Sequence, residues 1–280
     1  NSPMPSVSVA AGNAQFGFDN DFRRFMDAVL LGNDLVIIGA QFQRSPGGII
    51  SLAKRPIMRP EDLVGSRFLG QDGVETIVDT VLTMAGLPIE YDYFPAGYSV
   101  AALVEGQGDA YSAFAVNQPI TLQTEYGMEE GEDFFFVSWA ELGLGGYANM
   151  MFCKREFLEA EFETVVGFLR ATIKGWYYNA ERPNLAPKLV VNGPGRDLGL
   201  EIVQQQIQNK IQLGYMHSTL TDAKGIFWID PEDVEINMYP SLRAMGRADL
   251  PPAAEVFDTR ALQAAYEGIT LPLTLSDERA

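Results

Sequence analysis

Hydrogen-bonding amide side chains gather where the apolar strands of this sequence end. The pattern is clearest in residues 106–127, where an apolar strand stops on Asn117 and Gln118 and Pro119 follows. An amide both donates and accepts hydrogen bonds, which suits a neutral heterocycle with ring nitrogens and carbonyls better than a phosphate or a carboxylate. Pro119 fits the first turn of a helix, where its missing N–H is harmless, and it fixes the direction in which Asn117 leaves the strand.

Every other predicted strand also ends in polar or aromatic side chains. In open α/β sheets, ligands lie outside the carboxyl ends of the strands, next to the N-termini of the following helices. A plain alternative stays open, because Asn and Asp before a helix are ordinary N-caps worth about 1 kcal/mol. Phe42 and Tyr98 could stack on a planar ligand. The strand-end residues are Asp19, Asn20, Gln41, Phe42, Gln43, Gln71, Asp72, Tyr98, Asn117 and Gln118.

Residues for catalysis or for binding metals are scarce. The single cysteine, Cys153, excludes an internal disulfide, and with the single histidine, His217, it excludes the usual thiolate and imidazole zinc clusters. Carboxylate metal sites stay open. The run GPGRDLG (193–199) places its last glycine one residue late for a dinucleotide fingerprint, and the sequence has no GxxxxGK[ST] phosphate loop. These motifs therefore predict no catalytic centre.

Composition limits the classes of partner that the chain can bind. The chain has 37 acidic and 20 basic residues, a formal charge of -17, and this charge repels phosphate backbones. Nucleic acid is therefore excluded as a partner. No apolar run reaches the roughly 18 residues of a membrane span, and the first residues, NSPMPSVSV, lack the features of a signal peptide.

The elements that must position these side chains alternate between strand and helix in the first half of the chain. Residues 12–32 and 106–127 each read as a short strand, an Asn and a helix closed by Gly, which fits two similar α/β lobes. Residues 33–43 are typical of a buried parallel strand. Further strands are predicted in 47–54, 66–71, 89–98, 132–139 and 147–154, and helices in 73–87, 162–180, 197–211 and up to Gly268.

Proline-rich joins mark a lobe that is inserted into the chain. We expect lobe I to comprise residues 1–56 and 147–280 and lobe II to comprise residues 57–146. The chain would leave lobe I near residues 47–54 and return near 147–154, which gives a hinge of two strands.

Three segments, residues 40–73, 86–127 and 145–180, resemble the substrate-binding proteins of ABC importers that are related to the fungal thiamine-pyrimidine synthase. The resemblance implies a type II periplasmic binding fold, in which two α/β lobes close on a small molecule. It also implies a monomer without a cofactor, in the periplasm or on the cell surface, that delivers its ligand to a membrane permease. Members of the family bind riboflavin or thiamine pyrimidine precursors, and distant ones bind sulfonates such as taurine. The family's first strand and helix are expected to be missing ahead of Gly12.

From this resemblance we expect ten side chains to contact the ligand. Lobe I would contribute the first four, lobe II the next four and the hinge the last two: Asp19, Asn20, Gln41, Phe42, Gln71, Asp72, Tyr98, Asn117, Tyr147 and Asn149.

Three other functions remain as alternatives. A sulfonate site would need cations, and Arg44 is the main candidate. A pyrimidine synthase would consume bound pyridoxal phosphate and a histidine beside a cysteine cluster, whereas this chain has one residue of each type. A sensor lobe fused to a signalling module is the third alternative.

Overall fold

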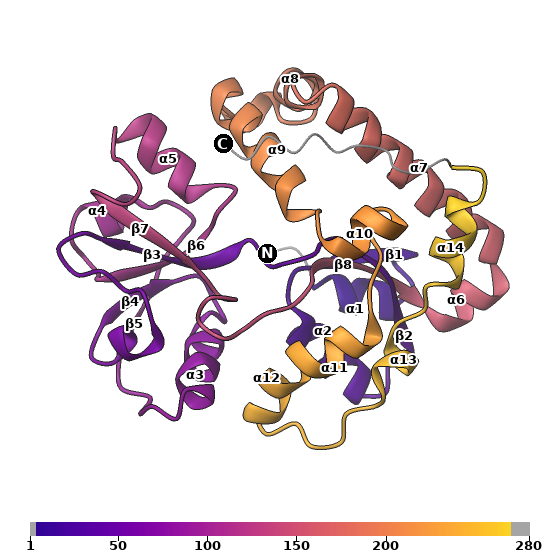
Figure 1. Cartoon of the computed structure of the whole chain (residues 1–280), viewed down its shortest axis with the longest axis horizontal. Coiled ribbons are helices and arrows are strands. Elements are labelled where there is room, and N and C mark those ends of the chain that lie inside the picture. The colour runs from indigo at the N-terminus through magenta and orange to yellow at the C-terminus, as the bar shows by residue number, and fades with distance from the viewer. Residues whose placement is uncertain (1–3, 270–280) are drawn as a thin grey trace.

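Two separate β-sheets divide the chain into two lobes in the computed structural model, which describes residues 4–269 (Figure 1). One sheet has three strands in the order β1-β8-β2, and the other has five in the order β5-β4-β6-β3-β7. We define lobe I as residues 4–42 and 148–269 and lobe II as residues 47–138. The strands are β1 (Phe16–Asp19), β2 (Leu35–Phe42), β3 (Gly47–Leu52), β4 (Arg67–Gly70), β5 (Asp92–Pro95), β6 (Ala110–Phe114), β7 (Phe134–Ser138) and β8 (Ala148–Lys154).

Helices surround both sheets. Lobe I carries α1 (Pro5–Ala10), α2 (Phe22–Leu30), α6 (Arg155–Ala160), α7 (Phe162–Glu181), α8 (Leu185–Asn192), α9 (Ile202–Tyr215), α10 (Thr219–Lys224), α11 (Pro231–Asn237), α12 (Tyr239–Ala244), α13 (Ala253–Val256), α14 (Arg260–Tyr266) and the 3-10 turn η2 (Arg196–Leu198). Lobe II carries α3 (Glu75–Met84), α4 (Ala101–Val104), α5 (Gln118–Glu125) and the 3-10 turn η1 (Pro60–Leu63). Among the described helices, none is both long and apolar enough to cross a bilayer.

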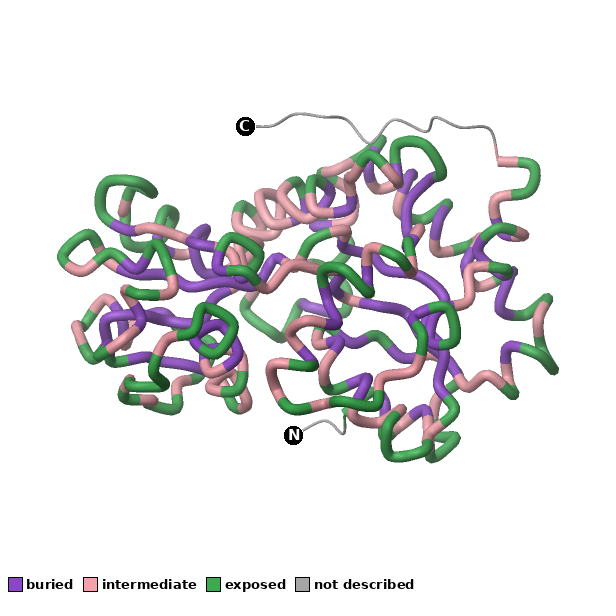
Figure 2. Tube along the Cα trace, turned by 60° about the horizontal axis from the view of Figure 1, so that its bottom comes forward, coloured by how far each residue is buried: buried purple, intermediate pink, exposed green. Residues whose placement is uncertain are grey.

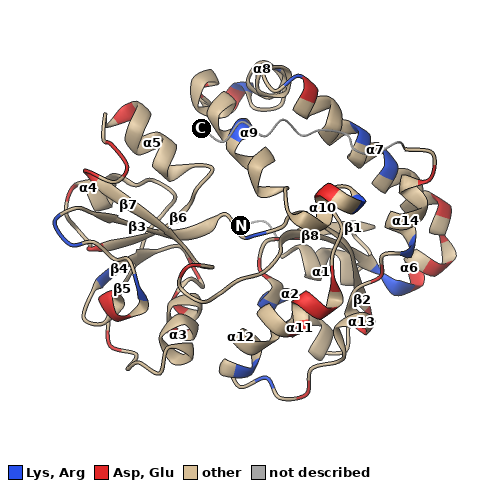
Figure 3. Cartoon of the chain, viewed as in Figure 1, with Lys and Arg blue, Asp and Glu red and all other residues tan. Residues whose placement is uncertain are grey.

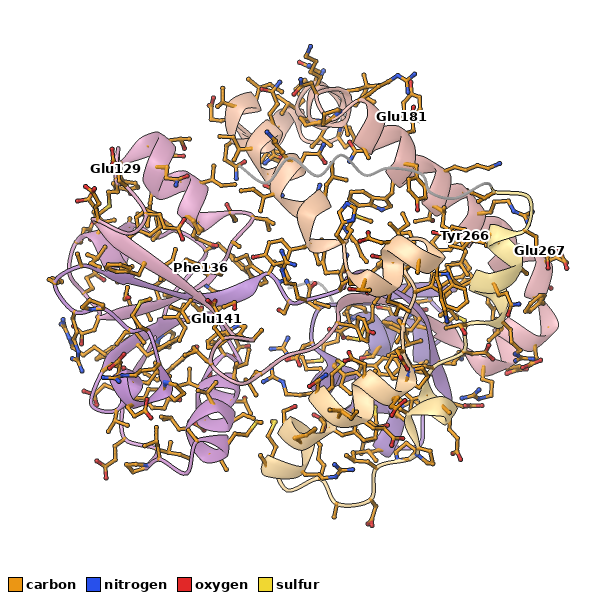
Figure 4. The ribbon with its side chains drawn as sticks, in the orientation of Figure 1. Glu129, Phe136, Glu141, Glu181, Tyr266 and Glu267 are labelled. Carbon is orange, nitrogen blue, oxygen red and sulfur yellow. The ribbon has the colours of Figure 1, made fainter. Side chains whose placement is uncertain are left out.

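The sheet of lobe I is apolar on both faces because helices cover both. Along β2, Val36 and Ile38 point into a core with α7, α9 and α14, whereas Leu35 and Ile37 point into a core with α2 and α11 to α13. This alternation follows from the two-residue repeat of a strand. At the edge of the first core Tyr266, labelled in Figure 4, donates from its hydroxyl to the carbonyl oxygen of Ile226 at 2.9 Å.

The sheet of lobe II has the same sandwich arrangement. Ile49 and Phe68 pack with Val78 and Val81 of α3 on one face. On the other face Ile50 and Tyr111 pack with residues of α4 and α5. Figure 2 shows that the buried residues follow the strands of both lobes.

The predicted hinge position needs a correction. The sequence places residues 47–52 in lobe I, but β3 pairs with β6 and β7 in the sheet of lobe II. The chain therefore leaves lobe I in residues 43–46, before this strand and not after it. The return falls in residues 139–147, next to the predicted boundary, because β8 lies in the sheet of lobe I.

The expected parallel pairing of residues 33–43 is also wrong. β2 pairs with β8 in the antiparallel sense, and β1 pairs with the other edge of β8 in the same sense. β1, α2 and β2 still form a strand-helix-strand unit whose two strands run in one direction. The returning strand β8 inserts between them, and a local periodicity cannot reveal such an insertion.

Both connecting segments are fixed by hydrogen bonds. In residues 43–46, the backbone N–H of Gln43 donates to the carbonyl oxygen of Tyr215 at 2.8 Å, and its side chain bonds Trp228 and Ser218. In residues 139–147, the carboxylate of Glu141, which is labelled in Figure 4, accepts from the hydroxyl of Ser138 at 2.6 Å. The two lobes are thus joined at defined positions.

Candidate functional site

A cleft of about 390 Å³ lies between the two lobes. Its walls come from the turn between β1 and α2, the ends of β4 and β6, both connecting segments, and α12. Six of the ten residues predicted to contact a ligand line it: Asp19, Asn20, Gln71, Asp72, Tyr98 and Tyr147. Residues from both lobes therefore face one shared space.

Asp19, the last residue of β1, places a buried carboxyl in the cleft wall. Its exposed fraction is 8%, and its Oδ1 accepts from the backbone N–H of Asp21 at 2.9 Å. Burial, which disfavours the charged form, raises the pKa of Asp19 to about 6. This carboxyl can therefore accept a hydrogen bond as the anion or donate one as the acid near neutral pH.

Asp21 caps α2 and binds the two arginines of the cleft. It accepts from the backbone N–H of Arg23 at 3.0 Å, and the guanidinium of Arg23 pairs with it at 2.8 and 2.9 Å. The Nε of Arg24 lies 3.6 Å from the Oδ2 of Asp21, which Arg23 also contacts. Burial acts to raise the pKa of Asp21, but the hydrogen bonds and charge of Arg23 outweigh burial and lower it. Both guanidiniums are therefore partly neutralised.

Arg24 also reaches across the cleft. Its Nη2 donates to the carbonyl oxygen of Asp72 in lobe II at 3.2 Å. The next residue, Gly73, has a positive φ of 82°, and a Cβ there would lie 2.4 Å from Arg24 Nη2. Glycine thus permits both the turn and the approach of the guanidinium.

Gln71 lines the cleft, but its amide serves lobe II. Its Nε2 donates to the carbonyl oxygen of Gly97 and to the hydroxyl of Tyr111, each at 3.0 Å, and its Oε1 accepts from Ser112 at 2.5 Å. These bonds hold the loop that presents Tyr98. Tyr98 is 70% exposed and lines the cleft.

Aromatic rings form much of the remaining wall. Phe18, Phe114, Trp139 and Tyr147 join Tyr98 around the cleft. The hydroxyl of Tyr147 accepts from the backbone N–H of Asp230 at 3.1 Å, and burial raises the pKa of Tyr147 to about 12. Flat apolar surface and a few polar groups thus face the same space.

The other four predicted residues are not among those that line the cleft. Gln41 is buried, and its Oε1 accepts from the side chain of Asn149, which has a positive φ of 49°. Phe42 packs edge-on against Tyr215 in the core of lobe I. Asn117 accepts at 3.3 Å from the Nε2 of Gln204 in α9. The last residues of β2 and the first residues of β8 continue into the connecting segments. Neighbouring elements therefore cover these strand ends, and they do not open into the cleft.

Several lining residues were missed by the sequence reasoning. Trp139 directly follows β7. Ligands are expected at the carboxyl ends of strands, so the same argument applied to the predicted strand 132–139 could have found it. Arg24 sits in the first turn of α2, beside the predicted Asn20. Ser241 comes from α12 and Met238 directly precedes that helix, nearly 100 residues beyond the second connecting segment, and no local signal could have placed them here.

Three side chains that could bind a sulfonate, act in catalysis or hold a metal do not line the cleft. Arg44 is not among the lining residues, and its guanidinium stacks 4.7 Å from the Tyr215 ring centroid. His217 bonds Asp222 at 2.9 Å. Cys153 is buried in lobe I, and burial raises its pKa to about 12. Within residues 4–269, no group of three or more His, Cys, Asp or Glu is placed to hold a metal ion.

The comparisons with known proteins agree with this architecture. A family model described as NMT1/THI5 like matches residues 2–186. The periplasmic aliphatic sulphonate binding protein SsuA of Escherichia coli superposes with a TM-score of 0.61 at 14% identity, over 91% of this chain and 80% of its own. The fold is that of the type II periplasmic binding proteins, as predicted.

Two curated relatives are more similar in sequence. The 4-amino-5-hydroxymethyl-2-methylpyrimidine phosphate synthase of Legionella pneumophila is 29% identical over 163 residues, which is 57% of this chain and 51% of that protein. The formylaminopyrimidine-binding protein of Halalkalibacterium halodurans is 28% identical over 163 residues, which is 55% of this chain and 47% of that protein. The match thus spans about half the length of either relative.

Proposed function

The chain belongs to the NMT1/THI5-like family, and from this premise we propose that it is the solute-binding component of an ABC importer for a pyrimidine-type heterocycle. It would work outside the cytoplasm as a monomer without a cofactor, and it would present the ligand to a membrane permease. Binding of a ligand between the lobes would shift the population toward a closed form.

The observation that carries the proposal is the chemistry of the cleft. A flat ring would stack on Tyr98, which is 70% exposed. An exocyclic amine or a ring nitrogen would bond the buried carboxyl of Asp19, and Asn20 lies beside it. A cavity of about 390 Å³ lies within the range of small-molecule sites, about 300 to 1,000 Å³.

A sulfonate ligand receives less support from the cleft. The arginines that line it, Arg23 and Arg24, already pair with Asp21. A sulfonate would have to compete with that carboxylate for them. The third candidate cation, Arg44, stacks on Tyr215 and is not among the lining residues.

A pyridoxal phosphate chemistry also lacks its residues. It would need a lysine amine for the Schiff base, together with the histidine and cysteines expected of the synthase. No lysine, histidine or cysteine is among the described residues that line the cleft. We therefore assign no catalytic step to this site.

A cleft-filling variant tests the proposal. Gly145 lines the cleft, and a Cβ built there meets no atom within 4 Å, so Gly145→Leu should occupy the space without disturbing the fold. Thermal unfolding would be followed with riboflavin, thiamine, 4-amino-5-hydroxymethyl-2-methylpyrimidine and taurine. The two pyrimidine compounds, thiamine and 4-amino-5-hydroxymethyl-2-methylpyrimidine, should raise the melting temperature of the wild type and not that of Gly145→Leu.

Gly167→Leu is the matched control, because Gly167 in α7 also has open space at Cβ but does not line the cleft. It should respond as the wild type does. A response to taurine alone would replace the pyrimidine with a sulfonate. If no compound raises the melting temperature, the vitamin-type ligand is wrong.

A further inference from the structure

A second cavity, of about 440 Å³, lies within lobe I, away from the cleft. We call it the helical groove. Its walls come from α7, α8 and α9, which stand together at the top of Figure 1. It shares no lining residue with the cleft. The function proposed above does not use it.

The groove offers apolar walls and amides. Trp176, Pro187 and Val190 supply apolar surface, and amides come from Asn179 and Asn209 and from three glutamines of α9. None of its lining residues is charged. Such a lining selects against ions and favours an uncharged guest.

Four hydrogen bonds fix Asn209 at the floor of the groove. Asn209 exchanges two hydrogen bonds of 2.9 Å with Asn179, donates to the carbonyl oxygen of Pro183 at 2.8 Å and accepts from Gln212 at 2.8 Å. These four bonds use the full capacity of its amide.

The rim of the groove keeps free donors and acceptors. Among the described residues, the Nε2 of Gln208 and the Oε1 of Gln205 and Gln212 make no hydrogen bond. The Oε1 of Gln208 accepts only long bonds, at 3.2 Å from Gln205 and 3.3 Å from Gln204. A guest that presents both N–H and C=O groups would match this set.

The rim also contacts lobe II. Gln204, which donates to Gln208, donates as well to the Oδ1 of Asn117 at 3.3 Å. α9 thus runs from the first connecting segment, where Tyr215 accepts from Gln43, to the other lobe. A guest that rearranged the rim amides would change a contact between the lobes, and linkage would make that effect reciprocal.

We propose that the helical groove is a second small-molecule site, which takes an uncharged planar heterocycle with amide edges. 5-Fluorouracil is a suitable probe because it is neutral, carries N–H and C=O groups, and reports binding through its fluorine NMR line. 5-Fluoroorotate, the same ring with an added carboxylate, is the matched ligand control.

Glycines of α7 give matched variants. Gly175 lines the groove and Gly167 does not, and a Cβ at either position meets no atom within 4 Å. Leucine at either position should therefore be accommodated, but only Gly175→Leu fills the groove. Both are made in the Gly145→Leu background, so that binding in the cleft does not contribute.

The fluorine line of 5-fluorouracil should broaden with Gly145→Leu and with Gly145→Leu/Gly167→Leu. Gly145→Leu/Gly175→Leu should bind it at least tenfold more weakly, and 5-fluoroorotate should bind more weakly than 5-fluorouracil to every variant. Equal binding by the two double variants, or no binding to Gly145→Leu, would overturn the groove site. Either result leaves the proposal for the cleft untouched, because that is tested by the Gly145→Leu change alone.

Discussion

Asp19 is the residue at which ligand binding and stability oppose each other. Burial raises its pKa to about 6 from 3.8, so between these values the native state holds a proton that the unfolded chain has lost. Stability therefore falls as the pH rises from about 4 to about 6, and the loss persists above that range. The expected loss is at most about 3 kcal/mol.

Asp19→Asn should remove this loss, because an amide oxygen can still accept from the N–H of Asp21. The variant should be more stable than the wild type by about 1 to 3 kcal/mol at pH 7 and equal to it at pH 4. Urea unfolding at both pH values measures the difference. If the stability difference between the variant and the wild type is the same at both pH values, the charge of Asp19 is not the source of that difference. The same variant should bind a pyrimidine more weakly.

At the scale of single residues, the sequence predicted those cleft-lining side chains whose strand ends open into the cleft, such as Asp19 and Tyr98. It failed for Gln41 and Asn149, which end or begin strands that continue into the connecting segments and bond each other. The type of a residue and its place at a strand end are local properties. Whether that end meets solvent or another strand is decided by the tertiary fold.

At the scale of elements, β3 decides where lobe II begins. The strand packs closely against β7, and a Cβ on Gly48 would lie 2.3 Å from the carbonyl oxygen of Val137 and 2.7 Å from the ring of Phe136. Local patterning found this strand but could not choose its partners, because an apolar run fits either sheet.

Gly48→Ala should therefore push β3 and β7 apart. We expect a loss of about 2 kcal/mol in the free energy of unfolding, within the range for overpacked positions. Gly97→Ala, in open space within the same lobe, should be neutral or more stable by a few tenths of a kcal/mol. Urea denaturation of both variants provides the test. Equal stabilities would show that β3 is not packed against β7 in this way.

At the scale of the whole molecule, both lobes are acidic. Residues 47–138 contain 14 acidic and four basic residues, a net charge of -10, which leaves -7 for the rest of the chain. Figure 3 shows red positions on both sides of the interlobe gap. The lobes therefore repel each other, and salt weakens that repulsion over about 10 Å at 0.1 M. Contacts across the cleft must oppose it.

Arg24 is such a contact, because its guanidinium brings a positive charge to Asp72 of lobe II and donates to its carbonyl oxygen. Its loss should cost about 0.5 to 1.5 kcal/mol, which favours the open arrangement about 2- to 13-fold. Small-angle X-ray scattering of Arg24→Ala without ligand should give a larger radius of gyration than the wild type, most clearly at low salt. Arg196→Ala removes the same charge from an exposed position paired with Asp197 and should leave the radius unchanged. If both variants expand alike, net charge governs the spacing of the lobes; if neither expands, the Arg24 contact does not hold them together.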